Sequence, residues 1–314
     1  MTSEWHLARE IRVRNIDEWL IVIHGNFGLP VVDDTQLYFR GERSQHTTLY
    51  PNLDRALASR RGLSTATRLK IERRIYSFAK VEASKPTATA NQRKYFDSVF
   101  TSYAYLRHFG VPTRLLDWSR DPLIASYFAC CDTCEKTGDV RDAPSVGQGF
   151  VRVVSATHLR RFADRHPTET QAWDEEVCSD SGHLCPRLLD VAGCNGLKRI
   201  LMPLEIADGF PRHVRQKGAY TCSTRVATDH WTHFSKHGIP HAVVIISETA
   251  KRDILDWLLK LGISRPYLFP REEDLIESVM ADIANESDVA AQAVHDAWWK
   301  TVLASEDADI HLVE

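Results

Sequence analysis

Apolar residues recur at helical spacing along several stretches of the chain. Within residues 14–26, for example, Ile16, Trp19 and Ile23 fall on one face and polar residues lie between them. A period of 3.6 residues is typical of an amphipathic helix with one buried side. The same pattern predicts further helices at 57–82, at 97–109, at 251–261, from residue 273 onward and at 289–303.

Short runs of β-branched and aromatic residues alternate with these helical stretches. They predict strands at 35–39, 113–119, 149–155, 218–223 and 242–247. Asp121 followed by Pro122 predicts the start of a helix that runs to about Cys131, because aspartate caps a helix and proline fits its first turn. Helices mixed with scattered short strands predict an α+β fold.

Composition narrows the class of protein. The chain has 314 residues, 43% hydrophobic and 26% charged, with a formal net charge of −3. A generic polybasic nucleic-acid binder is therefore disfavoured, whereas a local basic groove is compatible with this charge. No apolar run approaches the ~20 residues that a membrane-spanning helix needs, so no membrane contact is expected. Seven cysteines and no visible export signal predict reduced thiols and a cytoplasmic location.

The common catalytic motifs are missing from the sequence. It contains no GxGxxG, no GxxxxGK[ST], no HExxH and no GxSxG. Cys131 and Cys134 form a single CxxC pair, and a structural zinc site would need a second pair or closely spaced histidines. We therefore expect no metal site.

Three other segments combine residues suited to binding an anionic ligand. Phe39-Arg40-Gly41 places a guanidinium at a strand end, beside a glycine that permits a sharp turn or close backbone approach. Residues 113–119 (TRLLDWS) bring Thr, Arg, Asp and Ser together on one short strand, and residues 212–221 (RHVRQKGAYT) form a cationic loop that enters another. The structural alternatives are a salt bridge at the strand end, an Arg114–Asp117 ion pair and a solvated basic turn.

Together these segments resemble the FRG domain, which is named after the Phe-Arg-Gly found here at 39–41. The resemblance includes residues 108–119 (HFGVPTRLLDWS), 121–123 (DPL), 127–129 (YFA), 216–221 (QKGAYT), 261–263 (LGI) and 268–270 (LFP). It implies an N-terminal helical segment at 1–34, an FRG domain at 35–282 with an insertion at 167–198, and a C-terminal helix at 283–314.

The order of these motifs is similar to that of ADP-ribosyltransferases, which use NAD as a substrate. This likeness implies a core of short strands in a split sheet surrounded by helices. It also implies a bacterial toxin or phage-defence effector, held by an antitoxin protein, that modifies RNA or DNA in preference to protein. Arg40, Asp117 and Gln216 would be catalytic. The residues expected to contact NAD are Phe39, Gly41, Thr113, Arg114, Trp118, Ser119 and Phe128.

Gln216 stands where such enzymes usually carry a glutamate, so Asp117 is the candidate carboxylate, with Glu205 and Glu248 in reserve. The basic loop 212–217, together with Arg73-Arg74 and Arg160-Arg161, would form a groove for nucleic-acid phosphates. Two alternatives remain open at this point. One is a non-enzymatic module that binds nucleic acid or protein through the same pocket, and the other is a structural subunit in which these charges form only a buried ion network.

Overall fold

The computed structural model describes residues 9–29, 35–57, 64–70, 72–73, 93, 95, 99–108, 113–133, 140–171, 196–206 and 209–270. The predicted helices from residue 273 onward and at 289–303 lie outside these ranges. The same is true of most of the predicted helix 57–82 and of residues 172–195 in the predicted insertion.

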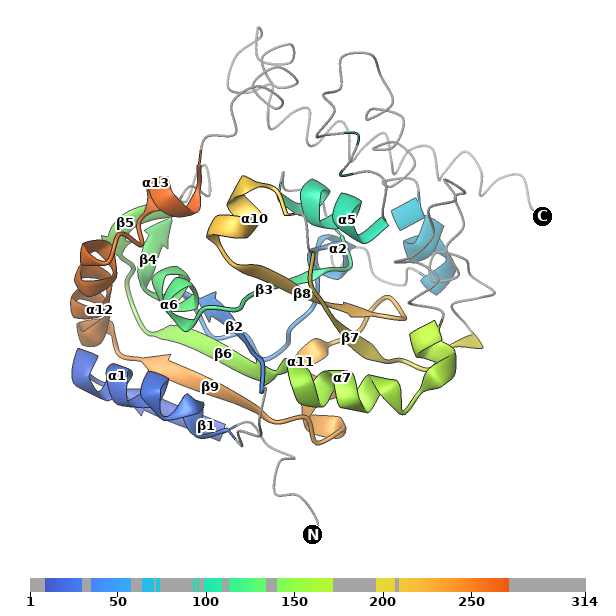
Figure 1. Cartoon of the computed structure of the whole chain (residues 1–314), viewed down its shortest axis with the longest axis horizontal. Helices are drawn as coiled ribbons and strands as arrows, with labels where there is room; N and C mark the ends of the chain where they lie inside the picture. The colour runs from blue at the N-terminus through green and yellow to red at the C-terminus, as the bar shows by residue number, and fades with distance from the viewer. Residues whose placement is uncertain are drawn as a thin grey trace, which may run out of the picture.

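A seven-stranded mixed sheet forms the centre of the molecule, in the order β1-β9-β6-β2-β3-β8-β7 (Figure 1). A separate two-stranded sheet pairs β4 with β5. Helices pack around the main sheet, so the predicted α+β class is confirmed. The strands are β1 (Arg9–Val13), β2 (Leu37–Glu42), β3 (Leu116–Ser119), β4 (Cys131–Thr133), β5 (Val140–Pro144), β6 (Gly149–Ser155), β7 (Leu201–Leu204), β8 (Gly218–Ser223) and β9 (His241–Ile246).

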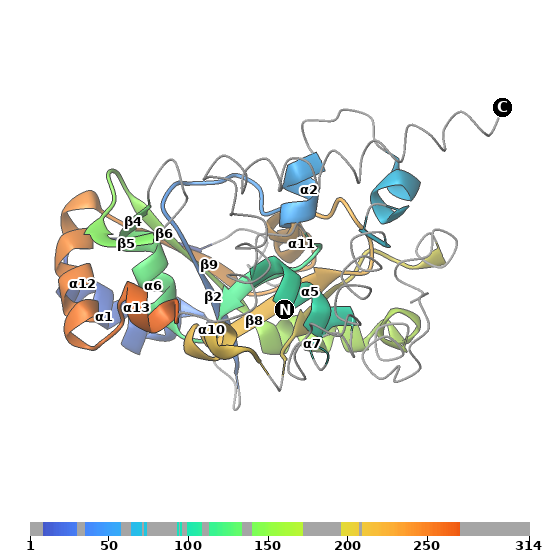
Figure 2. The same cartoon turned by 90° about the horizontal axis from the view of Figure 1, so that it is seen from above.

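Helices divide into two groups, each over its own hydrophobic core. Trp19, Ile124 and Leu258 bring α1, α6 and α12 onto one core, whereas Tyr103, Leu159 and Phe234 bring α5, α7 and α11 onto the other. In the view from above, α1, α6 and α12 lie on the left, and α5, α7 and α11 lie to their right (Figure 2). The helices are α1 (Ile16–His24), α2 (Asn52–Leu57), α5 (Val99–His108), α6 (Pro122–Cys130), α7 (Ala156–Asp164), α10 (Pro211–Arg215), α11 (His230–Lys236), α12 (Glu248–Lys260) and α13 (Arg265–Leu268), with a 3-10 turn at Asn26–Gly28.

Alternation along the central strands explains how one sheet serves both cores. Tyr38 and Val154 belong to the core under α5, α7 and α11, whereas their neighbours Phe39 and Val153 belong to the other. Successive side chains of a strand point to opposite faces, so a fully buried strand must be apolar at nearly every position. β6 and β9 fit this description, because every residue of both is buried.

Most of the predicted elements are present in the described ranges. The Asp121 carboxylate accepts a hydrogen bond from the Leu123 amide, which caps α6 where the sequence predicted it. The N-terminal segment differs from its prediction as purely helical, because β1 precedes α1 and pairs in parallel with β9. Its residues, Arg-Glu-Ile-Arg-Val, are mostly polar because β1 is an edge strand and is largely exposed. Among the described residues, no helix has the length and apolar character to cross a membrane.

Candidate functional site

A pocket of about 330 Å³ opens beside the junction of β2 and β3. These neighbouring strands are joined by a single backbone pairing, Phe39 with Ser119, although the strands on either side are paired over four to six residues. The residues that directly follow Phe39 on β2 and those that directly precede Ser119 on β3 line the opening. The full lining is Phe39, Arg40, Gly41, Glu42, Arg43, Ser44, His46, Asp117, Trp118, Ser119, Ala125, Phe128, Cys131, Arg212 and Gln216.

Arg40 bridges the two strands at this opening. Its Nη1 donates to the main-chain carbonyl of Asp117 at 3.0 Å, and its Nε donates to Glu42 Oε1 at 3.0 Å. The side chain is 17% exposed, so the guanidinium is held by protein on one side and faces the pocket on the other. A fixed guanidinium of this kind is suited to phosphate or ribose oxygens.

Asp117 carries a carboxylate into the same pocket. Arg107 on α5 donates to it through both Nε and Nη2, and Arg40 Nη1 lies 3.9 Å from its Oδ2. Burial raises the pKa of this carboxyl, but the guanidinium groups of Arg107 and Arg40 outweigh burial and hold the pKa below its ordinary value. Asp117 is therefore ionised at neutral pH, with 41% of its side chain exposed.

Glu42 is a second carboxylate at the pocket that the sequence analysis did not select. It accepts from Arg40 and, at 2.7 Å, from Arg152 Nε on β6. Burial opposes its ionisation, yet the two guanidinium groups keep its pKa below the ordinary value. The sequence predicted that this strand ends at residue 39, whereas β2 runs to Glu42, and alternation along it places Glu42 on the same face as Arg40.

Gln216 lies at the pocket but part of its side chain is engaged. Its Nε2 donates to the Leu268 carbonyl at 3.1 Å, which leaves Oε1 as the acceptor. Ser119 was predicted to contact NAD, and its hydroxyl instead donates to the Gln216 carbonyl at 2.8 Å and accepts from the Asp121 amide. Ser119 therefore joins the start of α6 to the turn that carries Gln216.

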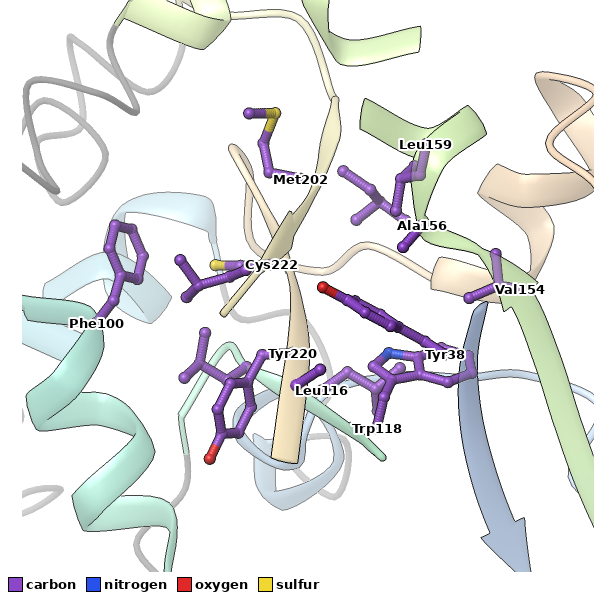
Figure 3. Packing of buried hydrophobic residues seen from close by; sticks show 14 of the residues in the cluster. Tyr38, Phe100, Leu116, Trp118, Val154, Ala156, Leu159, Met202, Tyr220 and Cys222 are labelled. Atoms are coloured by element: carbon purple, nitrogen blue, oxygen red, sulfur yellow. The ribbon is translucent and has the colours of Figure 1, made fainter. Parts of the chain in front are cut away.

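Of the three predicted aromatic residues, Phe128 has the most accessible ring. Phe128 is half-buried on α6 and contacts Phe269 edge to face at 6.0 Å. The Trp118 indole instead lies in the core beside Tyr38 (Figure 3), where its Nε1 donates to Thr221 at 2.8 Å. Phe39 also packs in a core, 5.0 Å from the Phe27 ring.

Thr113 and Arg114 were predicted to contact NAD, but neither lines this pocket. Arg114 is 3% exposed and forms a buried ion pair with Glu72, which accepts at 2.6 Å from its Nε. Thr113 is fully buried, and its carbonyl accepts from the Leu53 amide. The predicted alternative of an Arg114–Asp117 pair is also wrong, because Asp117 pairs with Arg107.

Comparison with known protein families gave one match, and it covers part of this site. Residues 35–138 match the FRG domain. Comparison with curated proteins and with solved structures gave no match. The FRG match contains Arg40, Asp117 and Phe128, whereas Arg212 and Gln216 reach the pocket from beyond its C-terminal limit.

The glycine of the FRG motif serves helix packing. A Cβ on Gly41 would overlap the Ala125 carbonyl oxygen and lie 2.7 Å from the Ala129 amide nitrogen. The backbone of β2 therefore lies directly against α6, and this contact holds Phe128 over the pocket. Gly41 was expected to contact NAD. The close approach of α6 is by itself enough to require glycine at this position.

The pocket has a cationic rim that the sequence predicted only in part. Arg43 on the loop after β2 and Arg212 on α10 line it, and Ser44 and His46 complete that edge. Arg160 and Arg161, which were predicted to extend a phosphate groove, do not line this pocket. Arg160 donates instead to the Pro203 carbonyl on β7, and Arg74 lies outside the described ranges.

The reserve carboxylates, Glu205 and Glu248, also lie away from the pocket. Glu205 accepts from the Tyr38 hydroxyl and from Arg120 Nη1, each at 3.0 Å, and Glu248 begins α12. Neither lines the pocket, so Asp117 and Glu42 are its two carboxylates among the described residues.

Proposed function

We propose that this protein is an NAD-dependent ADP-ribosyltransferase that modifies a macromolecule. The observation that carries the proposal is the convergence of Arg40, Asp117 and Gln216 on one pocket. Arg40 lies on β2, Asp117 on β3 and Gln216 just before β8, and these three strands are consecutive in the sheet. The motif order that resembles ADP-ribosyltransferases in the sequence thus corresponds to three neighbours in space.

The charges in the pocket support the chemistry that this reaction requires. Cleavage of the bond between ribose C1′ and the nicotinamide nitrogen sends the bonding electrons to the leaving ring and develops positive charge on the ribose. The ionised carboxylates of Asp117 and Glu42 stabilise that charge, and Gln216 Oε1 is free to accept from a ribose hydroxyl. An acceptor oxygen or nitrogen then bonds to C1′ and releases its proton.

Binding of the substrate is assigned to two kinds of side chain. Arg40 supplies donors to the diphosphate or to the adjacent ribose, from a position fixed by Glu42 and by the Asp117 carbonyl. Phe128 supplies an aromatic surface for the nicotinamide ring, since stacked or edge-to-face rings are favourable contacts.

The acceptor that we propose is RNA or DNA, and the biological role is that of a toxin or defence effector. Exposed Arg43, Arg215 and Lys217 lie on the segments that border the pocket, and cations at such a rim attract a phosphate backbone. These residues do not by themselves make a sequence-specific surface, so the proposal assigns them to positioning of the acceptor.

Arg40→Ala tests this proposal. Incubation of the purified protein with labelled NAD and a bacterial lysate is expected to label the nucleic-acid fraction, and the variant is expected to lose roughly 100-fold or more of that rate. The fold is expected to persist, because Glu42 keeps its ion pair with Arg152. Circular dichroism and the melting temperature check this, and Arg252→Ala, at an exposed arginine on α12 outside the pocket, serves as the control.

The fractions separate the possible outcomes. Label on protein would leave the transferase and correct the acceptor. Release of free ADP-ribose alone would make the protein an NAD hydrolase. Neither labelling nor nicotinamide release by a folded protein would overturn the proposal and favour a non-enzymatic binding module, which salt-dependent binding of RNA or DNA would then reveal.

A further inference from the structure

The proposed transfer requires a group that takes up a proton. When an oxygen or nitrogen of the acceptor bonds to ribose C1′, it must lose the hydrogen that it carried. A side chain placed to receive that proton is a general base, and it typically speeds a reaction by roughly 100- to 10,000-fold. Such a base must line the pocket, and it must be able to bind a proton near neutral pH.

The two carboxylates of the pocket do not meet this requirement. Asp117 accepts from Arg107 through two nitrogens, and Glu42 accepts from both Arg40 and Arg152. These guanidinium groups outweigh burial and hold the pKa of each carboxyl below its ordinary value. Both carboxylates are therefore weak bases at neutral pH, and their charge is already engaged by arginine.

The thiol and the arginines of the pocket fail for other reasons. Burial raises the pKa of the Cys131 thiol to about 12, so this group keeps its own proton at neutral pH. A guanidinium is already protonated and has no lone pair to accept a further proton. Among the described residues that line the pocket, His46 is the remaining ionisable side chain, and imidazole exchanges a proton near neutral pH.

The backbone of His46 is fixed at the pocket although its side chain is exposed. Its main-chain carbonyl accepts from Nη2 of Arg152, a buried residue of β6 whose guanidinium lies 4.4 Å from the centre of the Trp231 ring. Three residues later, the Leu49 amide donates to the Asp229 carboxylate at 2.7 Å. The segment is thus held from β6 and from the residue that caps α11, while the imidazole stays accessible at the rim.

The neighbours of His46 at the rim suit the approach of an acceptor. Ser44 Oγ lies 3.4 Å from His46 Nε2, so a hydroxyl contacts the imidazole at the edge of the pocket. Arg43 is exposed and lines the same edge. A phosphate of the acceptor that binds Arg43 would bring the neighbouring hydroxyl or amine of that acceptor toward the imidazole.

From this placement we infer that His46 is the general base that receives the proton of the acceptor. A lone pair of the acceptor forms the new bond to C1′, and the bond from C1′ to nicotinamide breaks with its electrons going to the leaving ring. The proton passes from the acceptor oxygen or nitrogen to a ring nitrogen of His46, and solvent then removes it from the exposed imidazole. This inference rests on the proposed function, because the proton arises only when an acceptor is modified.

Two adjacent exposed residues make a matched test. Gln45 is exposed like His46 but does not line the pocket. Labelling of the nucleic-acid fraction from labelled NAD is measured for the wild type, His46→Gln and Gln45→Ala. We expect His46→Gln to lower kcat roughly 100-fold with the KM for NAD unchanged, and Gln45→Ala to match the wild type. The fold is expected to persist in His46→Gln, because Arg152 binds the main chain of His46, and the melting temperature checks this.

Free imidazole adds a measurement that a structural role would not move. In His46→Ala, imidazole in solution is expected to restore part of the labelling rate in proportion to its concentration, without stimulating Gln45→Ala. The inference is overturned if His46→Gln labels as fast as the wild type, or if it raises the KM for NAD with kcat unchanged. It is also overturned if a folded His46→Ala protein is slow and imidazole does not increase its rate.

Failure of this inference can be told apart from failure of the proposed function. Full labelling by His46→Gln would retain the transferase and reject the base. Neither labelling nor nicotinamide release by the wild type would reject the transferase and the base together. If the wild type only releases ADP-ribose, water is the acceptor, and the same variants are compared by the rate of that release.

Discussion

Gly41→Ala is expected to destabilise the protein by more than about 3 kcal/mol, because overpacking against backbone cannot be relieved by a change of rotamer. The new Cβ would overlap the Ala125 carbonyl and lie 2.8 Å from the Phe128 Cβ. Either α6 must move away from β2 or β2 must shift. Each movement would loosen the core that these two elements share with α1 and α12. The free energy of unfolding, measured in urea, checks the prediction.

Gly196→Ala is the matched control for this substitution. A Cβ at that position meets no atom within 4 Å, so its unfolding free energy is expected to stay within about 0.5 kcal/mol of the wild type. A Gly41→Ala protein as stable as the wild type would contradict the packing role of the glycine and return it to the list of residues that approach a ligand.

Lowering the pH is expected to decrease the free energy of unfolding already at pH values well above those at which carboxylates are protonated. Burial is the first cause of low pKa values in three histidines, about 4 for His213 and about 3 for both His230 and His233, against an ordinary 6.5. These rings stay neutral in the folded chain but take up protons in the unfolded chain below pH 6.5. Stability therefore falls as the pH decreases from about 6.5 toward 4, by up to ~1.4 kcal/mol per pH unit for each histidine.

Unfolding in urea at a series of pH values measures this slope. His213→Gln cannot take up the proton, so the slope is expected to decrease by up to ~1.4 kcal/mol per pH unit between pH 6 and 4.5. Val214→Gln introduces the same side chain at an exposed neighbour that carries no ionisable group, and it is expected to leave the slope unchanged. A slope that His213→Gln does not alter would mean that this ring titrates alike in the folded and unfolded chain.

The sequence predicted site residues best where one short motif contains them. Arg40 and Asp117 were selected from short motifs, and both line the pocket. Pairings between distant residues could not be predicted in the same way. Arg114 was assigned to NAD as part of the motif at 113–119, whereas its partner, Glu72, precedes it by 42 residues and lies within the predicted helix 57–82.

Residues that act through packing were also hard to recognise. Arg107 stands next to the quoted motif, but its helical context gave no sign that it would bind Asp117 across to β3. β1 was missed because an edge strand needs few apolar residues, and its partner, β9, lies more than 200 residues later. Trp118 was expected to contact NAD, yet its ring faces the core, which alternation along so short a strand did not decide.

The single pairing between β2 and β3 has a consequence for how this protein can vary. The core under α5, α7 and α11 includes residues of both strands, whereas the other core includes Phe39 of β2 and no residue of β3. Apart from the shared core and the single pairing, the two strands are joined here by the hydrogen bond from Arg40 to the Asp117 carbonyl. An apolar substitution in the core that β3 does not reach therefore needs no matching change on β3, whereas a substitution of Arg40 alters the boundary itself.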